Sequence, residues 1–321
     1  MSAIRTFARD IMTNFSYGIE EIGTSLDLEA SKSLIDCMID IKEKPENFKP
    51  KLNTLNLDYF GLKGKQTTVL LLTGGLDSTI AYYRLLEEGY ENVLPVYVDF
   101  GQPYAKKELK ALDALNLPYF YFKDAIPVWY DGPWEHIIPA RNLYFLALAS
   151  EMLVDGGEVW ISSVAGETPN YGGDKSLAFY TQFEELVANT TDKTIIVRCM
   201  NEYTKSGWVK WFLEKALLDN LSREEKIYIL KTTVSCFTGH GHLNCGKCRA
   251  CLRKWISLAR NDIACEEIFE VHPYHGANAL VEEYKNRIHE ALTNEDFSYF
   301  TKDRCHDTLS VFKKFEQNLE S

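Results

Sequence analysis

Two glycines followed by an acidic residue and two hydroxyl residues form the first stretch of this chain that indicates chemistry. The run Thr73-Gly74-Gly75-Leu76-Asp77-Ser78-Thr79 follows four apolar residues and precedes a helix-like stretch from Ile80. Glycines let the backbone approach a ligand closely, and the free N–H groups at a helix start bind anions. An ordinary strand–helix turn with Ser, Thr and Asp as caps is the alternative. The full combination favours a phosphate-binding loop in which Asp77 helps to bind Mg²⁺.

Four cysteines within sixteen residues form a second candidate site: Cys236, Cys245, Cys248 and Cys251. Thiolates separated by two residues suit a tetrahedral Zn²⁺ ion, and Gly246 permits the tight turn of a zinc knuckle. An iron–sulfur cluster and four unligated structural cysteines are the alternatives. If zinc binds, we expect a structural ion, because four protein ligands leave no open position for catalysis.

The elements that would position these residues alternate between strands and helices. We predict strands at 69–72, 93–100, 119–122, 158–163 and 194–197, and helices at 80–86, 106–115, 141–153 and 177–187. This alternation predicts an α/β fold with a doubly wound, mostly parallel five-stranded sheet of the Rossmann-like kind. Ligands of such sheets bind beyond the C-terminal ends of the strands, where the strand order reverses. The loops 73–78, 99–102 and 164–175 are therefore expected to form the site.

The rest of the 321 residues divide around this core. We expect an N-terminal extension at 1–64, the α/β domain at 65–234, a zinc-binding segment at 235–274 and a helical, charged tail at 275–321. The charges of the tail are expected to mark solvated helix faces.

Composition excludes several classes of function. The formal net charge of −11 disfavours tight binding to nucleic acid. No stretch approaches the roughly 20 apolar residues of a membrane span, and the N-terminus lacks the apolar core of a signal peptide. We therefore expect a cytoplasmic protein that acts on a small molecule.

The ordered set of motifs resembles a known family. The phosphate loop resembles the Ser-Gly-Gly-x-Asp-Ser loop of N-type ATP pyrophosphatases, with Thr73 in place of the leading Ser. Phe100-Gly101-Gln102, Pro139-Ala140-Arg141-Asn142, Thr204-Lys205 and Ser235-Cys236-Phe237 follow in that order, before Cys-Gly-x-Cys-x-x-Cys. Together they are similar to the 7-cyano-7-deazaguanine (preQ0) synthases of the QueC family, over roughly Thr67 to Tyr274.

The resemblance implies a role for each matching residue. Thr73 to Thr79 and Gln102 would bind ATP, with Asp77, Ser78, Lys205 and Arg141 as the catalytic set. Arg141, Asn142, Tyr171 and Asp174 would bind the deazaguanine, and the four cysteines would bind zinc. Taken alone, Arg141 and Asn142 equally suit a helix start, Lys205 a surface charge and Gln102 a turn.

The implied reaction uses ATP, Mg²⁺ and ammonia to convert 7-carboxy-7-deazaguanine into an amide and then into the nitrile preQ0. The loop Gly166–Ser176 departs from the family pattern, because Lys175-Ser176 replaces its Cys-Arg pair. Alternatives are an enzyme that stops at the amide, or one that couples the activated carboxyl to an amine of a protein partner bound through the terminal extensions. A tRNA-modifying enzyme of the same superfamily and a non-catalytic zinc module are further alternatives. The oligomeric state stays open, with a homodimer among the candidates.

Overall fold

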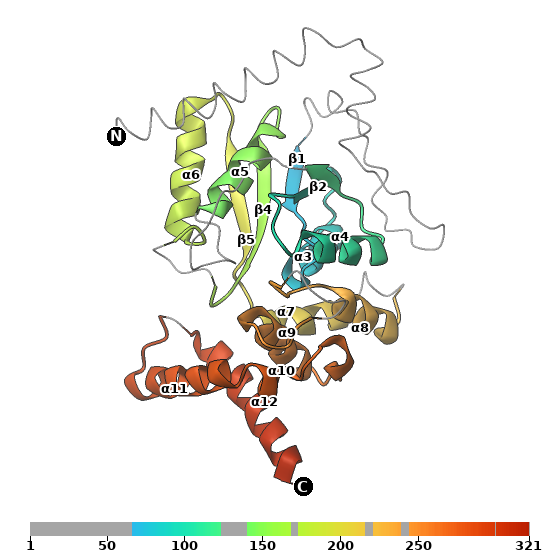
Figure 1. Cartoon of the computed structure of the whole chain (residues 1–321). Coiled ribbons are helices and arrows are strands. Elements are labelled where there is room, and N and C mark those ends of the chain that lie inside the picture. The colour runs from blue at the N-terminus through green and yellow to red at the C-terminus, as the bar shows by residue number, and fades with distance from the viewer. Residues whose placement is uncertain are drawn as a thin grey trace. The chain divides into compact units, whose positions relative to one another are not determined.

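Five parallel strands form the centre of the fold. A computed structural model of the chain describes residues 66–122, 140–167, 173–215, 221–238, 244–298 and 300–320. The strands are β1 (Thr67–Leu71), β2 (Val93–Val98), β3 (Phe120–Phe122), β4 (Gly157–Val164) and β5 (Ile195–Met200). They pair in parallel in the order β3-β2-β1-β4-β5. Figure 1 labels β2, β1, β4 and β5 of this sheet. The predicted doubly wound parallel sheet of five strands is confirmed.

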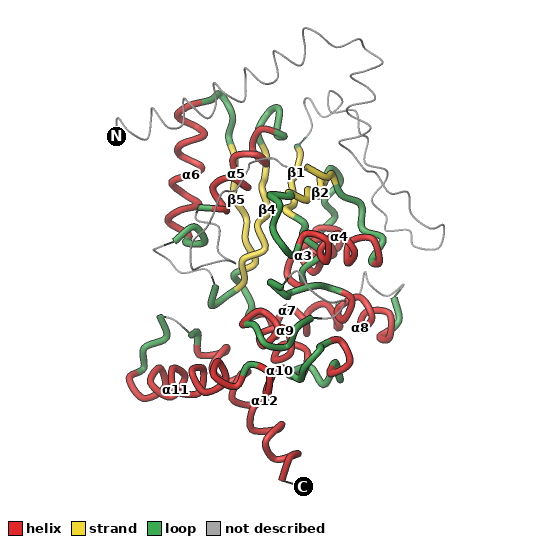
Figure 2. The backbone as a smooth tube through the Cα atoms, viewed as in Figure 1, coloured by secondary structure: helices red, strands yellow, loops and turns green. Residues whose placement is uncertain are grey.

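Helices cover both faces of this sheet. Those that follow the first four strands are α3 (Leu76–Glu87), α4 (Ala105–Ala114), α5 (Arg141–Glu151) and α6 (Leu177–Thr190). Leu70 and Leu72 belong to the hydrophobic cluster that includes α3 and α4, whereas Val69 and Leu71 belong to the cluster that includes α5 and α6. Figure 2 shows these helices beside the strands of the sheet. Burial on both faces explains why β1 is a continuous apolar run.

The sheet reverses its strand order between β1 and β4, which are neighbours although α3, β2, α4, β3 and α5 separate them in sequence. Loops that follow β1, β2 and β4 therefore meet at one edge, as the sequence predicts.

The second half of the described chain is helical. It comprises α7 (Lys205–Glu214), α8 (Arg223–Thr232), α9 (Arg249–Ala259), the short 3-10 helix η3 (Glu266–Ile268), α10 (Pro273–Gly276), α11 (Asn278–Asn294) and α12 (Lys302–Glu320). Apolar residues of α11 and α12, among them Tyr284 and Phe312, join the same hydrophobic cluster as α3 and α7. The tail is therefore packed on the core, and its charges are not all solvated. Arg304 and Asp307, described below, make specific contacts with the site.

Several strand ends differ from the predicted ones, and two of the differences have local reasons. β2 ends at Val98, because Gly101 turns the chain with a φ of +79° and donates its N–H to Asp99 Oδ1 at 2.7 Å. β5 continues past 197 to Met200, because Arg198 lies on an edge strand and pairs with Glu158 of β4 at 3.0 Å. A polar residue at an exposed edge does not interrupt a strand.

Two of the predictions lie outside the described residues: the N-terminal extension at 1–64 and the position of Tyr171. Among the described helices, none is long and apolar enough to cross a membrane.

Candidate active site

The phosphate loop, Thr73–Ser78, is closed by its own hydroxyl groups. The Thr73 N–H donates to Ser78 Oγ at 3.1 Å, the two side-chain oxygens lie 3.2 Å apart, and the Gly75 N–H donates to Thr73 Oγ1 at 3.3 Å. Gly74 has a φ of +70°, and a Cβ there would lie 2.9 Å from the carbonyl oxygen of Glu108. The second residue of the loop is therefore required to be glycine by both conformation and space.

Helix α3 begins in this loop without a side-chain cap. Its N-cap residue is Gly75, whereas the N-caps of α6, α7 and α8 are Ser176, Thr204 and Ser222, each of which accepts a backbone N–H. The first N–H groups of an α-helix have no acceptor within the helix, and they carry its positive partial charge. The loop thus presents amide donors to a ligand, which is the arrangement that binds phosphate.

Asp77 and Lys205 form an ion pair at the same place. Lys205 Nζ contacts Asp77 Oδ2, and both side chains are more than four-fifths buried. Burial raises the pKa of Asp77, and the Lys205 ammonium group opposes that effect. The other oxygen, Asp77 Oδ1, is buried and has no hydrogen-bond partner in the described part of the chain. A buried carboxylate oxygen without a donor is suited to bind a cation.

A cavity of about 490 Å³ opens in front of the loop. Its lining includes eleven of the residues singled out from the sequence, namely Thr73, Gly75, Leu76, Asp77, Ser78, Gln102, Arg141, Asn142, Asp174, Lys205 and Cys236. Gly74 and Thr79 do not line it. The Thr79 side chain is fully buried and its N–H donates to Gly75 O. Contact of Thr79 with ATP stays a prediction.

Gln102 connects the turn after β2 to the wall of the cavity. Its Oε1 accepts the Phe100 N–H at 2.8 Å, and its Nε2 donates to Tyr97 Oη at 3.0 Å and to Glu108 Oε2 at 3.3 Å. These contacts occupy both ends of the amide. Gln102 thereby fixes the position of Glu108, and contact with ATP stays a prediction.

Arg141 and Asn142 begin α5 at the cavity. Arg141 donates to Tyr104 Oη at 3.2 Å. Asp174 binds Asn142 twice, accepting its N–H at Oδ2 (3.2 Å) and its side-chain amide at the carbonyl oxygen (2.9 Å). The structure brings these three residues together, and it shows that Asp174 caps α5. A further contact of Asp174 with a substrate ring stays a prediction.

Facing the loop is the β4 wall, which we define as Glu167, Asp174 and Lys175. Glu167 Oε1 accepts from Arg253 of α9 at 2.7 Å, and its Oε2 lies 3.4 Å from Lys175 Nζ. Burial alone would raise the pKa of Glu167, but Arg253 and Lys175 outweigh burial and hold this pKa well below its usual range. The carboxylate is therefore ionised and fixed between two cations.

Residues of the C-terminal helices support this wall from behind. Arg304 of α12 donates to Gly166 O at 2.9 Å, and its guanidinium group lies over the Phe300 ring at 4.3 Å. Asp307 accepts from Thr204 at 3.0 Å. Thr204 is the N-cap of α7 and directly precedes Lys205. Helix α12 therefore contacts both the start of the helix that carries Lys205 and, through Gly166, the loop that carries Glu167.

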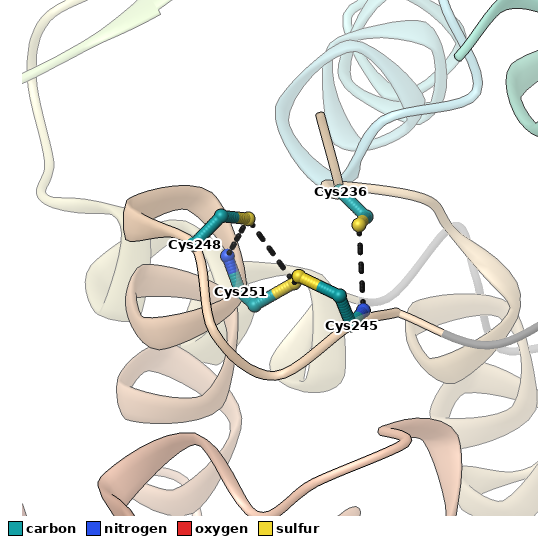
Figure 3. A group of neighbouring side chains, drawn as sticks. All are labelled: Cys236, Cys245, Cys248 and Cys251. Carbon is teal, nitrogen blue, oxygen red and sulfur yellow. Dashed lines mark hydrogen bonds between the residues drawn. The ribbon is translucent and has the colours of Figure 1, made fainter. Parts of the chain in front are cut away.

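The four cysteines meet as the spacing predicts. Their sulfur atoms all lie within 4.8 Å of one another, with Cys245 and Cys251 3.8 Å apart (Figure 3). Zn–S bonds of about 2.3 Å in a tetrahedron place sulfurs about 3.8 Å apart, so the donor set fits zinc. Backbone N–H groups of Cys245 and Cys251 point at the sulfurs of Cys236 and Cys248 (3.3 and 3.5 Å), and such donors stabilise thiolates. Hydrogen bonds from the neighbouring thiols lower the pKa of Cys236.

The cysteine segment is joined directly to the phosphate loop. The Val234 N–H, two residues before Cys236, donates to Gly74 O at 2.9 Å. Lys254, fully buried on α9, donates to Thr233 O and, at 3.1 Å, to Lys231 O. A metal bound at the cysteines would therefore fix the chain that contacts the loop.

Several polar cavity residues were not predicted from the sequence, among them Glu108, Glu167 and Arg253. Glu108 lies on an amphipathic helix among other charged residues, and nothing in its spacing distinguishes it. Glu167 belongs to the loop that departs from the family pattern, and Arg253 follows Cys251 by two residues. Their position at the site depends on tertiary structure. For Arg253, the helix predicted at the last cysteine was a sequence feature that indicates a position near the cysteine site.

Known proteins match the sequence of this chain. The family model "Queuosine biosynthesis protein QueC" matches residues 127–261. A 7-cyano-7-deazaguanine synthase of Acetivibrio thermocellus is 30% identical over 223 residues, which cover 57% of this chain and 89% of that protein. The enzyme of the same name from Bdellovibrio bacteriovorus is 26% identical over 243 residues, 65% of this chain and 100% of that protein. That of Nautilia profundicola is 33% identical over 128 residues, covering 32% of this chain and 57% of that protein. The chain belongs to the QueC family.

Proposed function

We propose that this protein is an ATP-dependent C–N ligase that converts 7-carboxy-7-deazaguanine and ammonia into the amide and then into 7-cyano-7-deazaguanine. The observation that carries the proposal is the uncapped start of α3, with Asp77 and Lys205 beside it, inside a cavity of about 490 Å³. A cavity of this size is within the range of small-molecule sites. The names of the similar proteins supply the substrate class.

The phosphate side of the cavity suits adenylation. A carboxylate resists attack by an amine, because its leaving group would be oxide, whereas an acyl adenylate releases AMP. The α3 amides and Lys205 would stabilise the charge that develops on the phosphates. Asp77 Oδ1 would be a ligand of Mg²⁺, which supplies neutralisation of phosphate charge when bound.

Aromatic side chains in the lining of the cavity suit a flat, purine-like ring. Phe100 and Phe145 stack with their centroids 5.0 Å apart, and Tyr104 and Phe237 lie 6.0 Å apart. All four line the cavity. Aromatic walls of this kind bind a heteroaromatic ring by stacking. Asp174 is the carboxylate that we assign to the N–H groups of the ring.

The remaining assignments follow from the same site. We assign the cysteines to a structural zinc ion, because all four ligand positions are filled by protein. Reduced thiolates persist in the cytoplasm, and we place the protein there. The terminal extensions as a protein-binding element and a homodimeric assembly stay predictions from the sequence.

Incubation with 7-carboxy-7-deazaguanine, ATP, Mg²⁺ and ammonium, followed by mass spectrometry, tests the proposal. We expect the amide to appear first and the nitrile to accumulate as the amide declines. Formation of the amide alone would restrict the activity to the first half, and a mass shift on an added protein would indicate conjugation. Absence of both small products would refute the proposal.

A further inference from the structure

Glu108 is a carboxylic acid at the cavity for which adenylation has no use. It lies on α4 directly behind the phosphate loop, where its carbonyl oxygen is the neighbour of Gly74. Tyr97 Oη donates to its Oε2 at 2.8 Å, and Gln102 Nε2 donates to the same oxygen at 3.3 Å. These are the hydrogen bonds that its carboxylate makes in the described chain, and Oε2 accepts both of them. The other oxygen, Oε1, is left for other partners.

The other carboxylates that line the cavity are already engaged. Asp77 is paired with Lys205, and Glu167 is held between Arg253 and Lys175. Asp174 accepts the N–H that begins α5. The cations around Glu167 stabilise its unprotonated form and make it a weak base. Asp77 is held at the phosphate loop by its contact with Lys205. Among the cavity carboxylates that the structure describes, Glu108 alone has neither an ion-pair partner within 4 Å nor a helix to cap.

The proposed reaction needs a proton acceptor in both of its halves. When ammonia attacks the acyl adenylate, the C–N bond forms and the nitrogen becomes positively charged. It must lose a proton before the C–O bond to AMP breaks and AMP leaves with the electron pair. In the second half, the adenylated amide loses its two N–H protons as the C–O bond breaks and the C≡N bond forms.

We propose that Glu108 is the catalytic residue that accepts these protons from the substrate nitrogen. Its carboxylate takes the proton in each transfer and returns it to solvent through the open cavity before the next one. The inference rests on the proposed function and goes beyond it, because adenylation itself releases no proton from nitrogen.

The surroundings of Glu108 support this assignment. Burial raises its pKa to about 7, while the hydrogen bonds from Tyr97 and Gln102 and the charge of Arg141 act in the opposite direction and Asp99 adds to the rise. Tyr104, which accepts from Arg141, is the other titratable group nearby. A base whose pKa lies near the working pH is the most effective proton acceptor.

Substitution Glu108→Gln tests the inference, because glutamine keeps an acceptor for Tyr97 and cannot take a proton. We expect amide formation from ammonia to fall about 100-fold or more, the usual effect of losing a general base. Substrate-dependent ATP–pyrophosphate exchange should change less than about threefold, since it reports adenylation alone. Hydroxylamine should still form the hydroxamate, because its nitrogen loses a proton to water readily. Asp113→Asn, on the same helix outside the cavity, is the matched control.

Dependence on pH gives a readout that a structural role would not change. With rates plotted against free ammonia, the wild-type protein should gain activity as the pH rises through about 7, and Glu108→Gln should lack this rise. Tyr97→Phe removes a hydrogen bond that favours the ionised carboxylate, so the rise should move to higher pH.

Three outcomes would overturn the inference. Amide formation by Glu108→Gln at the wild-type rate would show that the proton goes elsewhere. A fall of pyrophosphate exchange and hydroxamate formation in parallel with amide formation would show that Glu108 only maintains the site. A Tyr97→Phe profile identical to wild type would also contradict it. Wild-type protein without any amide product would instead refute the proposed function.

Discussion

The phosphate loop and the β4 wall face the same cavity but are built differently. The loop is one run of six residues, and the hydrogen bonds among its own residues join positions at most five apart. Its contacts with Val234 and Lys205 add to this local network. The β4 wall depends on contacts across 86 residues, between Glu167 and Arg253, and across 138 residues, between Gly166 and Arg304. Bonds between neighbouring residues thus shape most of the loop, whereas bonds between residues far apart in sequence shape the β4 wall.

This difference separates general chemistry from specificity. The loop would activate ATP for any carboxylate, and a local motif is sufficient for that. The β4 wall belongs to the loop after β4, which departs from the family pattern. Its stabilising contacts come from Arg253 of α9 and Arg304 of α12. We expect changes in the loop to alter adenylation, and changes in the β4 wall to alter binding of the deazaguanine.

The largest effect should follow loss of the metal, because the cysteine segment contacts the phosphate loop through Val234 and the β4 wall through Arg253. Cys251→Ser should abolish zinc binding and detach α9, which carries Arg253, together with the segment at Val234 that contacts Gly74. Structural zinc contributes on the order of 10 kcal/mol to local folding. Zinc content and urea unfolding measure the effect, with Cys199→Ser, outside the cluster, as the control. A stable, active Cys251→Ser protein without metal would contradict this assignment.

The next largest effect should come from the loop itself. Lys205→Met should lower substrate-dependent pyrophosphate exchange by about 100- to 1000-fold, because a preorganised cation at the phosphates is lost. The fold and the affinity for the deazaguanine should be kept. Lys210→Met, on the exposed face of the same helix, is the matched control. Equal losses in both variants would show that α7, and not the cation, is responsible.

Glu167→Gln should weaken the β4 wall without stopping adenylation. Because the folded-state pKa of Glu167 is lowered, its ionised form stabilises the fold above the ordinary pKa of 4.5, and this contribution is lost as the pH falls below that value. The variant should be about 1–3 kcal/mol less stable at pH 7. Urea unfolding of both proteins from pH 7 to pH 3 should show the difference shrinking, and a constant difference would contradict the ion-pair account.

The smallest effect is expected from the most distant anchor. Arg304→Ala removes one charged hydrogen bond to Gly166 O, so the KM for the deazaguanine should rise about 2- to 12-fold. The rate of pyrophosphate exchange at saturating substrate should stay unchanged. Arg287→Ala, which removes a pair within α11, is the control. A loss of kcat with constant KM would show that α12 supports adenylation at the phosphate loop and not binding of the deazaguanine.

The same contrast explains what the sequence predicts. The order of strands and helices was predictable because each buried strand is an apolar run and each helix has its own periodicity. The phosphate loop and the cysteine site were predictable because their ligands are close in sequence. Their placement at one cavity follows from the reversal of strand order beside β1.

Other residues could not be placed without the fold. Glu108 is one of several charges on α4, and its orientation toward the cavity depends on Tyr97 of β2. Arg304 occurs in a charged tail, where solvent exposure is the ordinary expectation. Its contact with Gly166 becomes visible only when α12 is packed on the core. Long-range contacts of this kind leave no periodic pattern in the sequence.

Transfer of oxygen from the substrate to AMP tests the central claim most directly. With both carboxylate oxygens of 7-carboxy-7-deazaguanine labelled with ¹⁸O, adenylation and displacement should place one label in the first AMP. Conversion of the amide into the nitrile should place the second label in a second AMP. The account predicts labelled AMP, pyrophosphate and an unlabelled nitrile in the mass spectrum. Unlabelled AMP, or ADP and phosphate as the products of ATP, would contradict it.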